Sequence, residues 1–534
     1  EIPEAERKET WNKTAVWCEA NNQKIDAINY YKKAQNYERL LVVCNTLPMM
    51  HSNRIAQMLL EILDKAPLEV YENYPLIYTH QLRIFMSLGM IEYAEKKIQE
   101  TISRFEAMPP SPLAHQILTI CYGNKGLTRL FTATYTGDYN FISDFERCAY
   151  HSSQSGGSVV PLPLSVLNIS SFICRVNKPE KGEIERYIEM LETIAPLAAG
   201  ALGGMEWGVD TLARTELAFF KSDLAEAEQF AQETVKRARE WDQYEVENRA
   251  FFYLLRINLA RGNWDAIQGV FKQMEAQLDK VHYINRFTFH DILTASFYSR
   301  IGRMDKVPQW LKNDFEGSDL NSLNLGMEVL IKARCHMIER RYPSALAVLS
   351  ILENRNNPYD AGDFLFGMIS MKILNAVCRY RNHDKSGAFT SLEQAYHLAA
   401  PNGLDMPFIE LGKDMRSLTD AALKDGSSIP REWLKKIRLG ASAYAKKLFA
   451  VAEQNRAEDG ETVSRPLAND QAVLSPREKE VLTALLQGMT RVEIAAQTSL
   501  SANTVKSITR SIYNKLGALN KADAVRIAAG MDLV

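Results

Sequence analysis

Residues 212–231 read LARTELAFFKSDLAEAEQFA: an apolar helix, a short turn at 221–223 and a second apolar helix. The same arrangement returns in residues 251–267, FFYLLRINLARGNWDAI, where Gly262 and Asn263 form the turn. Neither helix of such a pair can bury its apolar face alone. The pairs are therefore expected to stack on one another into a curved array with a concave inner wall.

The turns recur about 40 residues apart from residue 222 onward. Later turns are expected at Gly302-Arg303-Met304, Arg341-Tyr342-Pro343 and Asn382-His383-Asp384, and earlier ones at Gly89-Met90, Gly137-Asp138 and Asn177-Lys178-Pro179. The period and the small turn residues resemble tetratricopeptide-type repeats in their longer variant. No useful strand-like alternation occurs, so we predict an all-α fold: a tetratricopeptide-like superhelix followed by a four-helix C-terminal domain.

The composition limits the class of protein. With 534 residues, 46% of them hydrophobic and 24% charged, the chain can build several cores. It has no apolar run that would cross a membrane, and its polar start at Glu1 contains no signal peptide. Seven scattered cysteines without a C-x-x-C pair indicate reduced thiols. We expect a cytoplasmic protein with no membrane partner and no metal site, whose first residue suggests truncation or processing.

Net charge is distributed unevenly. Residues 473–534 hold eight Lys and Arg against five Asp and Glu, which gives +3, while the rest of the chain carries −5. Between Asn503 and Lys521 there are four cations and no acid. A small basic patch on an acidic chain is typical of a nucleic-acid-binding module.

The chain divides into four parts. Residues 1–48 form a helical segment, expected to be the end of a linker or winged-helix-like domain, and 49–452 form the repeat sensor domain. Residues 453–472 are expected to be a linker, because the polar stretch 458–466 shows no apolar periodicity. Residues 473–534 form the last domain.

Capping residues divide the last domain into helices. Ser475 and Pro476 mark a first helix, because Ser is a preferred N-cap and Pro fits the first helical position. Thr490 caps a short second helix, and residues 499–501 form the turn to a third. A fourth is expected near Asn520. The second helix, the turn and the third helix form a helix-turn-helix unit.

The third helix has a polar face and an apolar face. Residues three and four positions apart share one side of a helix. This rule places four residues on the polar face: Lys506, Ser507, Arg510 and Ser511. It turns three others toward the core: Val505, Ile512 and Leu516. A long cation reaches guanine N7 and O6 or a phosphate, so this helix is predicted to lie in the major groove of double-stranded DNA.

Several spaced motifs resemble the DNA-binding domain of the LuxR family. They are Leu-Ser-Pro-Arg-Glu-Lys-Glu-Val-Leu from 474, Gly-Met-Thr from 488, Glu-Ile-Ala from 493, Leu-Ser-Ala-Asn-Thr-Val-Lys from 500 and Ile-Tyr-Asn-Lys-Leu-Gly from 512. The resemblance implies base contacts by Lys506, Ser507 and Arg510. It implies contacts near the DNA backbone by Thr504, Tyr513, Lys515 and Lys521. Ile508 and Thr509 depart from the family's usual His and aliphatic residue.

Repeats followed by this domain resemble the MalT-like large regulators of the LuxR family. In that group an N-terminal nucleotide-binding module precedes the repeats, the repeats bind an inducer, and the inducer promotes self-association and DNA binding. This sequence has no G-x-x-x-x-G-K-[ST] motif. We therefore expect no cofactor in this chain, and a nucleotide only if a missing N-terminal module exists.

An effector is expected on the concave wall, where aromatic and charged residues gather on the first helices of repeats. The candidates are Trp207, Asp210, Arg214, Arg249, Phe252, Arg256, Arg286, Phe289 and His290. This mixture suits a small polar-aromatic or anionic ligand.

We thus predict a DNA-binding transcription regulator whose repeats sense a small-molecule inducer and control oligomerisation and promoter binding. The alternative is a scaffold whose signal is a protein or peptide partner. No H-E-x-x-H, G-x-G-x-x-G or nucleophile-elbow motif occurs, so no catalysis is expected.

Overall fold

The computed structural model describes residues 2–458 except 22, short stretches between 46 and 89, and 137–139, 157–171, 281–285, 313–324 and 354–363. Toward the C-terminus it describes 476–486, 489–497, 502–516, 518 and 524. The elements in these ranges are helices and no strand occurs among them, which confirms the all-α prediction. The chain divides into two compact units, Glu1–Ala452 and Glu453–Val534.

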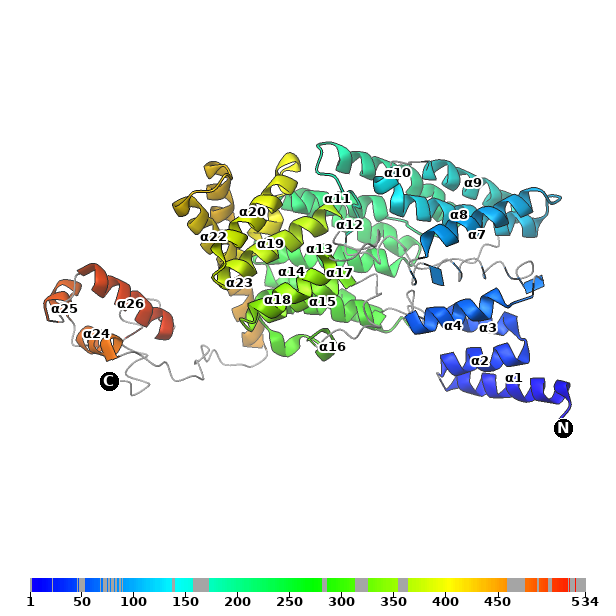
Figure 1. Cartoon of the computed structure of the whole chain (residues 1–534), viewed down its shortest axis with the longest axis horizontal. Helices are drawn as coiled ribbons and strands as arrows, with labels where there is room; N and C mark the ends of the chain where they lie inside the picture. Colours follow the sequence, from blue (N-terminus) through cyan, green and yellow to red (C-terminus); the bar gives the residue numbers. More distant parts are fainter. Residues whose placement is uncertain are drawn as a thin grey trace. The chain divides into compact units, whose positions relative to one another are not determined.

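Four helices begin the first unit: α1 (Glu4–Ala20), α2 (Lys24–Ala34), α3 (Tyr37–Asn45) and α4 (Asn53–Asp64) (Figure 1). Their apolar faces share one core, in which Ala27, Tyr31 and Leu59 are buried. The same core includes Ile77 and Ile84. The domain boundary expected at residue 48 therefore falls inside a continuous core, because α4 buries its apolar face together with the first three helices.

Four further helices follow: α7 (Ile91–Glu106), α8 (Pro112–Thr136), α9 (Phe141–Gln154) and α10 (Glu183–Ala201). Helices α8 and α9 approach each other closely at Gly126. A Cβ atom at this position would lie 2.9 Å from Cε2 of Phe145, which is fully buried. The absence of a side chain at Gly126 thus makes room for the aromatic ring of the neighbouring helix.

From Val209 onward the helices form pairs. These are α11 (Val209–Phe220) with α12 (Leu224–Glu240), α13 (Tyr244–Arg261) with α14 (Trp264–Leu278), α17 (Leu325–Ile338) with α18 (Tyr342–Glu353), and α19 (Leu365–Arg381) with α20 (Lys385–Ala399). Between them, α15 (Arg286–Ile301) is followed by two short helices, η2 (Met304–Lys306) and α16 (Gln309–Lys312). The breaks at 221–223, 262–263 and 382–384 confirm the predicted turns.

One predicted turn is displaced. Arg341-Tyr342-Pro343 was expected to separate two helices, but α18 already begins at Tyr342 and Pro343 is its second residue. Proline is tolerated in the first turn of a helix, because the backbone N–H that it lacks has no partner there. The break lies at 339–341 instead, where Arg340 has a φ of 60°.

The turns share one backbone arrangement. Ser222 and Gly262 have φ angles of 68° and 75°, which end the preceding helix. The next residue is the N-cap of the following helix: the side chains of Asp223 and Asn263 accept backbone N–H groups at 3.0 and 3.2 Å. The pair at 383–384 repeats this arrangement. At these turns the chain thus reverses direction through a left-handed backbone conformation and a capping side chain.

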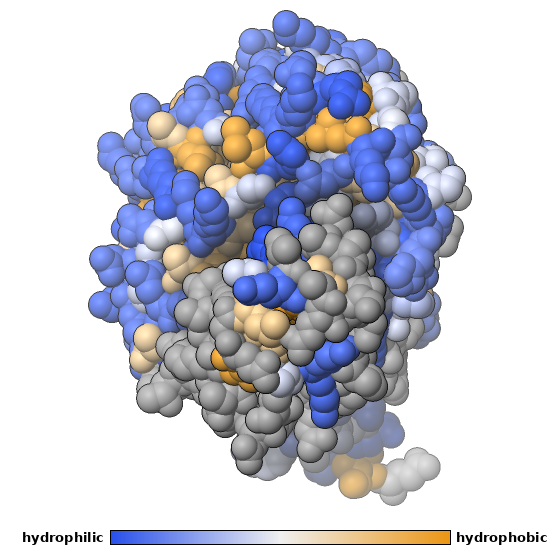
Figure 2. Space-filling view, turned by 90° about the vertical axis from the view of Figure 1, so that its left-hand side faces the viewer, coloured by the Kyte–Doolittle hydropathy of each residue, from blue (hydrophilic) through white to orange (hydrophobic). Residues whose placement is uncertain are grey.

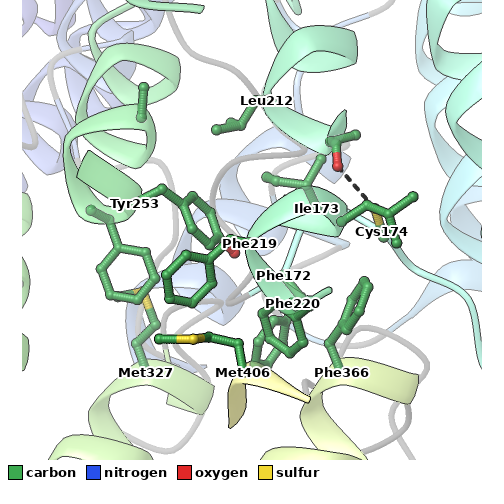
Figure 3. Packing of buried hydrophobic residues seen from close by; sticks show 14 of the residues in the cluster. Phe172, Ile173, Cys174, Leu212, Phe219, Phe220, Tyr253, Met327, Phe366 and Met406 are labelled. Carbon is green, nitrogen blue, oxygen red and sulfur yellow. Dashed lines mark hydrogen bonds between the residues drawn. The ribbon is translucent and has the colours of Figure 1, made fainter. Parts of the chain in front are cut away.

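The core of the repeats joins segments that are far apart in the sequence (Figure 3). The rings of Phe220 and Phe366 lie 4.3 Å apart between centroids, and Phe172 packs against both. Near these rings, the buried carboxylate of Glu216 accepts the backbone N–H groups of residues 173–174 at 3.0 and 2.7 Å. These contacts fix the segment before α10 against α11 and α19.

The last helices of the first unit are η5 (Ala400–Asn402), α21 (Met406–Ile409), α22 (Gly412–Asp425) and α23 (Arg431–Glu458), and α23 runs past the end of the unit at Ala452. Helix α23 continues six residues into the linker expected at 453–472. Asn455 is 3% exposed, and Arg456 pairs with Glu453 at 3.0 Å. The polar composition suggested a linker, whereas burial of one helix face preserves the helix to Glu458. Residues 459–472 lie outside the described ranges.

The second unit contains α24 (Pro476–Leu486), α25 (Arg491–Gln497) and α26 (Ala502–Leu516). Their shared core includes Val481, Leu482, Leu485, Ile494, Val505 and Ile512. Thr490 caps α25 as predicted: its backbone N–H donates to Glu493 Oε2 at 2.6 Å, and the N–H of Glu493 donates to Thr490 Oγ1 at 3.4 Å. Ser475 and the fourth helix expected near Asn520 lie outside the described residues.

The surface agrees with a chain that buries its apolar side chains between helices. On the face drawn in Figure 2, hydrophilic side chains predominate and apolar ones form small patches. All seven cysteines are buried as free thiols. In the part of the chain that the structure describes, no helix combines the length and hydropathy needed to span a bilayer.

Candidate nucleic-acid interface and arginine cavity

Helix α26 has the two faces that the sequence predicts. Val505 and Ile512 are fully buried and Leu516 is 7% exposed, so these residues attach the helix to the core of the second unit. Lys506 and Arg510 are exposed. They stand four residues apart, which places both cations on one side of the helix. An exposed pair of long cations on a rigid helix is suited to contacts with base edges and phosphates.

Two neighbouring hydroxyl groups face the protein instead of this surface. The Ser511 hydroxyl donates a hydrogen bond of 2.8 Å to Glu478 Oε1 on α24. Thr509 is 3% exposed, and its hydroxyl donates to the carbonyl oxygen of Val505 at 2.7 Å. Ser511 was expected to project beside the two cations, but the position of α24 turns its side chain into a contact between helices.

The remaining predicted DNA contacts are placed only in part. Tyr513 is half-buried, and burial raises the pKa of its hydroxyl. Three residues belong to α26, but their side chains lie outside the described part of the structure: Thr504, Ser507 and Lys515. Lys521 lies outside it altogether.

A second site lies within the first unit, where four successive first helices of the repeats surround a cavity of about 50 Å³. It is lined by Phe172, Phe252, Arg256, Ser296, Arg300, Met327, Leu330, Ile331, Arg334, Ser370, Ile373, Leu374, Pro407, Glu410 and Leu411. We call this the arginine cavity, because α13, α15 and α17 each contribute one arginine: Arg256, Arg300 and Arg334.

The three arginines differ in their partners. Arg256 forms two hydrogen bonds with Glu410, from Nε at 3.0 Å and from Nη2 at 2.5 Å. Its guanidinium lies over the rings of Phe219 and Phe252, 4.3 and 4.9 Å from their centroids. Arg256 is thus held on two sides, by a carboxylate and by aromatic faces.

Arg300 and Arg334 are less completely paired. Arg300 Nη1 donates to the carbonyl oxygen and to Oγ of Ser296, at 2.7 and 2.5 Å. Its Nε is buried without a hydrogen-bond partner and lies 3.6 Å from Glu410 Oε1. Arg334 is half-buried, and no ion pair or hydrogen bond joins it to any residue that the structure describes. Donor groups therefore remain available in the cavity.

Charge in the cavity is unbalanced. Burial alone would raise the pKa of Glu410, but Arg256 and Arg300 lower it to about 2, so this carboxyl is ionised. Burial, together with the charge of Arg334, lowers the pKa of Arg300 to about 9. Burial also lowers the pKa of Arg334. One carboxylate thus faces three guanidinium groups, and the excess charge is positive.

The structure brings only Phe252 and Arg256 of the predicted effector residues into this cavity. The others lie elsewhere and have protein contacts. Three of them form hydrogen bonds or ion pairs on the repeats: Trp207 Nε1 donates to Glu240 at 2.8 Å, Asp210 accepts from Arg237 at 2.8 Å, and Arg214 Nε donates to Glu192 at 2.5 Å. Arg249 Nη1 lies 2.8 Å from Met327 Sδ, and the Arg286 guanidinium lies 4.6 Å from the ring centroid of Phe287. Phe289 is 2% exposed, and His290 Nδ1 lies 4.0 Å from Asp291.

Sequence reasoning missed Arg300, Arg334 and Glu410. The two arginines carry a signal, since they follow Arg256 at roughly the repeat spacing on successive first helices. Glu410 carries none, because it comes from a segment beyond the last predicted turn and reaches the cavity only through the fold.

Comparison with known proteins finds a family match in each of two regions of the chain. Residues 207–425 match the family described as MalT-like TPR region, and residues 472–528 match the luxR family of bacterial regulatory proteins. The chain therefore combines a MalT-like TPR region with a C-terminal luxR-family domain, as the sequence motifs predicted.

The relatives match stretches of very different length. The HTH-type transcriptional regulator MalT of Cronobacter sakazakii is 24% identical over 283 residues, which are 52% of this chain and 31% of that protein. The probable transcriptional regulatory protein SgaR of Hyphomicrobium methylovorum is 48% identical over 54 residues, which are 10% of this chain and 26% of that protein. The transcriptional activator protein EsaR of Pantoea stewartii is 40% identical over 65 residues, which are 12% of this chain and 26% of that protein.

The chain thus spans between about a quarter and a third of the length of these relatives. Their names describe transcription regulators, which is the class of protein that the sequence motifs predict.

Proposed function

We propose that this chain is the sensor and output part of a transcription regulator. Its C-terminal unit binds double-stranded DNA through α26, and its helical repeats sense an effector. The observation that supports DNA binding most directly is the exposed pair Lys506 and Arg510 on a helix whose opposite face is buried. This helix lies within the segment that matches the luxR family.

Self-association is part of this proposal. A single helix-turn-helix domain contacts few phosphates, so useful affinity requires two or more domains on spaced half-sites. Effector binding in the repeats would alter how protomers associate and present their DNA-binding domains. The arginine cavity supports a sensing role, because a cavity with unpaired donor groups among the repeats is a place where a ligand adds contacts.

Selection from a randomised pool of double-stranded DNA tests the proposed output. The full chain is used to enrich sequences, and its affinity for the enriched and for a scrambled sequence is measured by fluorescence anisotropy at several salt concentrations. We expect a sequence preference, and an affinity that falls as salt rises because cations on α26 replace counterions. The proposal is wrong if the protein, at concentrations where it self-associates, prefers no sequence.

A scaffold that binds a protein or peptide is the second candidate, and a groove supports it. The groove has a volume of about 510 Å³ and is lined by Glu228, Gln232, Val235, Lys236, Arg239, Leu254, Asn258, Ala266, Val270 and Gln273, from α12, α13 and α14. Its mixture of apolar and charged side chains fits an extended peptide. A peptide library screened against the full chain, with Val235→Asp as the blocking variant, distinguishes this function from small-molecule sensing.

A further inference from the structure

The arginine cavity has a composition that the fold alone does not explain. Buried charges in proteins are normally paired, because an unpaired charge loses its hydration without compensation. Here Arg256, Arg300 and Arg334 share the single carboxylate of Glu410. The next carboxylate, Asp414, already accepts a hydrogen bond of 2.9 Å from Arg381. Among the residues that the structure describes, the cavity therefore holds more positive than negative charge.

Two arginines of the cavity and a tyrosine nearby have donor groups that lack acceptors among the residues that the structure describes. Arg300 is 9% exposed in its side chain, yet its Nε has no hydrogen-bond partner. Arg334 has no ion pair or hydrogen bond within the described ranges of the chain. The hydroxyl of Tyr444 on α23 is also buried without a partner, and it lies close enough to Arg300 and Glu410 for their charges to affect its ionisation. A ligand in the cavity that supplies negative oxygen atoms gives the two arginines the acceptors that they lack.

The size of the cavity limits the ligand. One water molecule needs roughly 10–15 Å³ of such volume, so about 50 Å³ holds three to five atoms of that size. A tetrahedral oxyanion has this size. Guanidinium groups bind phosphate oxygens in pairs, with a fixed geometry that an ammonium group lacks.

We propose that the arginine cavity binds a phosphate group, held by Arg300 and Arg334 next to the existing pair of Arg256 and Glu410. The phosphate belongs to a small phosphorylated metabolite or is free phosphate. This inference rests on the proposed sensing function of the repeats and names the ligand class. When the ligand is absent, Glu410 neutralises only part of the positive charge of the three arginines. The bound phosphate neutralises the rest.

Isothermal titration calorimetry and thermal unfolding of the full chain test the site. The probes are inorganic phosphate, glycerol 3-phosphate, succinate and glycerol. We expect both phosphates to bind and to raise the unfolding temperature, and glycerol to do neither. Tighter binding of glycerol 3-phosphate indicates a phosphorylated metabolite, and tighter binding of inorganic phosphate indicates the free ion. Absence of phosphate binding, or tighter binding of succinate, overturns the assignment.

Variants locate the binding. Arg334→Gln should weaken phosphate binding at least tenfold, since it removes a charge-assisted contact. Because Arg334 is half-buried and has no partner within the described ranges, this substitution is the one least expected to unfold the chain. The matched control is Arg438→Gln on α23, whose arginine pairs with Asp420 at 3.2 Å on the surface; it should leave binding unchanged. Equal effects of the two variants overturn the site.

Glu410→Gln gives a readout that a structural role does not predict. It removes the negative charge that competes with phosphate, so phosphate should bind this variant more tightly than the parent chain. Phosphate should also raise the unfolding temperature of the variant by more than it raises that of the parent chain. A smaller increase overturns the proposal.

The effect of phosphate on DNA affinity is measured separately. Arginine-dependent phosphate binding that leaves DNA affinity unchanged supports the site and contradicts the sensing function. A neutral compound that changes DNA affinity without phosphate binding supports sensing and overturns this site.

Discussion

Arg256 and Glu410 are 154 residues apart in the sequence and form a two-point ion pair at 3.0 and 2.5 Å. Their side chains are 8% and 2% exposed. The pair joins α13 to the segment between α21 and α22, so it ties the middle of the repeats to their end. A buried pair of this kind is costly to break, because the remaining partner becomes an uncompensated charge.

Glu410→Gln should therefore lower the free energy of unfolding of the first unit by about 3–5 kcal/mol in the absence of anions. Urea denaturation of the full chain, followed by circular dichroism, measures the change. The control is Asp420→Asn, which removes an exposed carboxylate paired with Arg438. An exposed pair contributes less than about 1 kcal/mol, so equal losses in the two variants would contradict the role assigned to the buried pair.

Glu410 also makes stability depend on pH. Its pKa is about 2 in the folded protein against an ordinary value of 4.5. The unfolded chain therefore binds this proton more readily than the folded chain. The stabilisation is complete above about pH 4.5 and is lost as pH falls from there through about 2. Between pH 6 and 3 the parent chain should lose stability more steeply than Glu410→Gln in parallel urea titrations, and parallel curves would contradict this account.

The sequence predicts the repeats well because their signals are local. Periodic apolar residues define each helix, and pairs such as Gly262 with Asn263 define each turn through backbone conformation and capping. The core that α1 to α4 share and the end of α23 at Glu458 could not be predicted in the same way. Asn455, near the end of α23, is 3% exposed, and composition does not report such burial.

The two sites differ in the same respect. The buried and exposed faces of α26 follow from helical spacing, so Val505 and Lys506 lie as predicted. Ser511 does not, because its environment depends on where α24 crosses the helix. In the arginine cavity, Phe252 and Arg256 were recognisable as aromatic and cationic residues on a first helix. Glu410 could not be recognised in the sequence, because only the folded chain brings it to Arg256.

A side chain at Gly262 should lower the stability of the first unit. Its φ of 75° lies in the left-handed region, and a Cβ atom there would lie 3.3 Å from Cβ of Lys447. Gly262→Ala should destabilise the first unit by about 1 kcal/mol or more. Gly269, in the middle of α14, is the matched control, because a Cβ atom there meets open space.

In this control, Gly269→Ala should stabilise the same unit by roughly 0.5–1 kcal/mol, since alanine is the better helix former. Differential scanning calorimetry of both variants gives the comparison. Shifts of the same sign would show that the turn does not depend on the backbone freedom of Gly262.

Arg510 and Ser511 are neighbours on α26 with different expected roles. Arg510 is exposed, so Arg510→Ala should leave the stability of the second unit within about 0.5 kcal/mol and weaken binding to the enriched DNA by about 1–3 kcal/mol. Ser511 donates to Glu478, so Ser511→Ala should lower that stability by about 1 kcal/mol and change DNA affinity less than Arg510→Ala does.

Amide hydrogen exchange of the second unit and fluorescence anisotropy with DNA separate the two effects. Lys479→Ala on α24 controls for the loss of one exposed cation away from the face of Lys506 and Arg510. A loss of affinity in Ser511→Ala as large as that in Arg510→Ala would mean that the serine leaves Glu478 when DNA binds. The polar face predicted from helical spacing would then be the one that DNA contacts, and the contact with α24 would belong to the free protein alone.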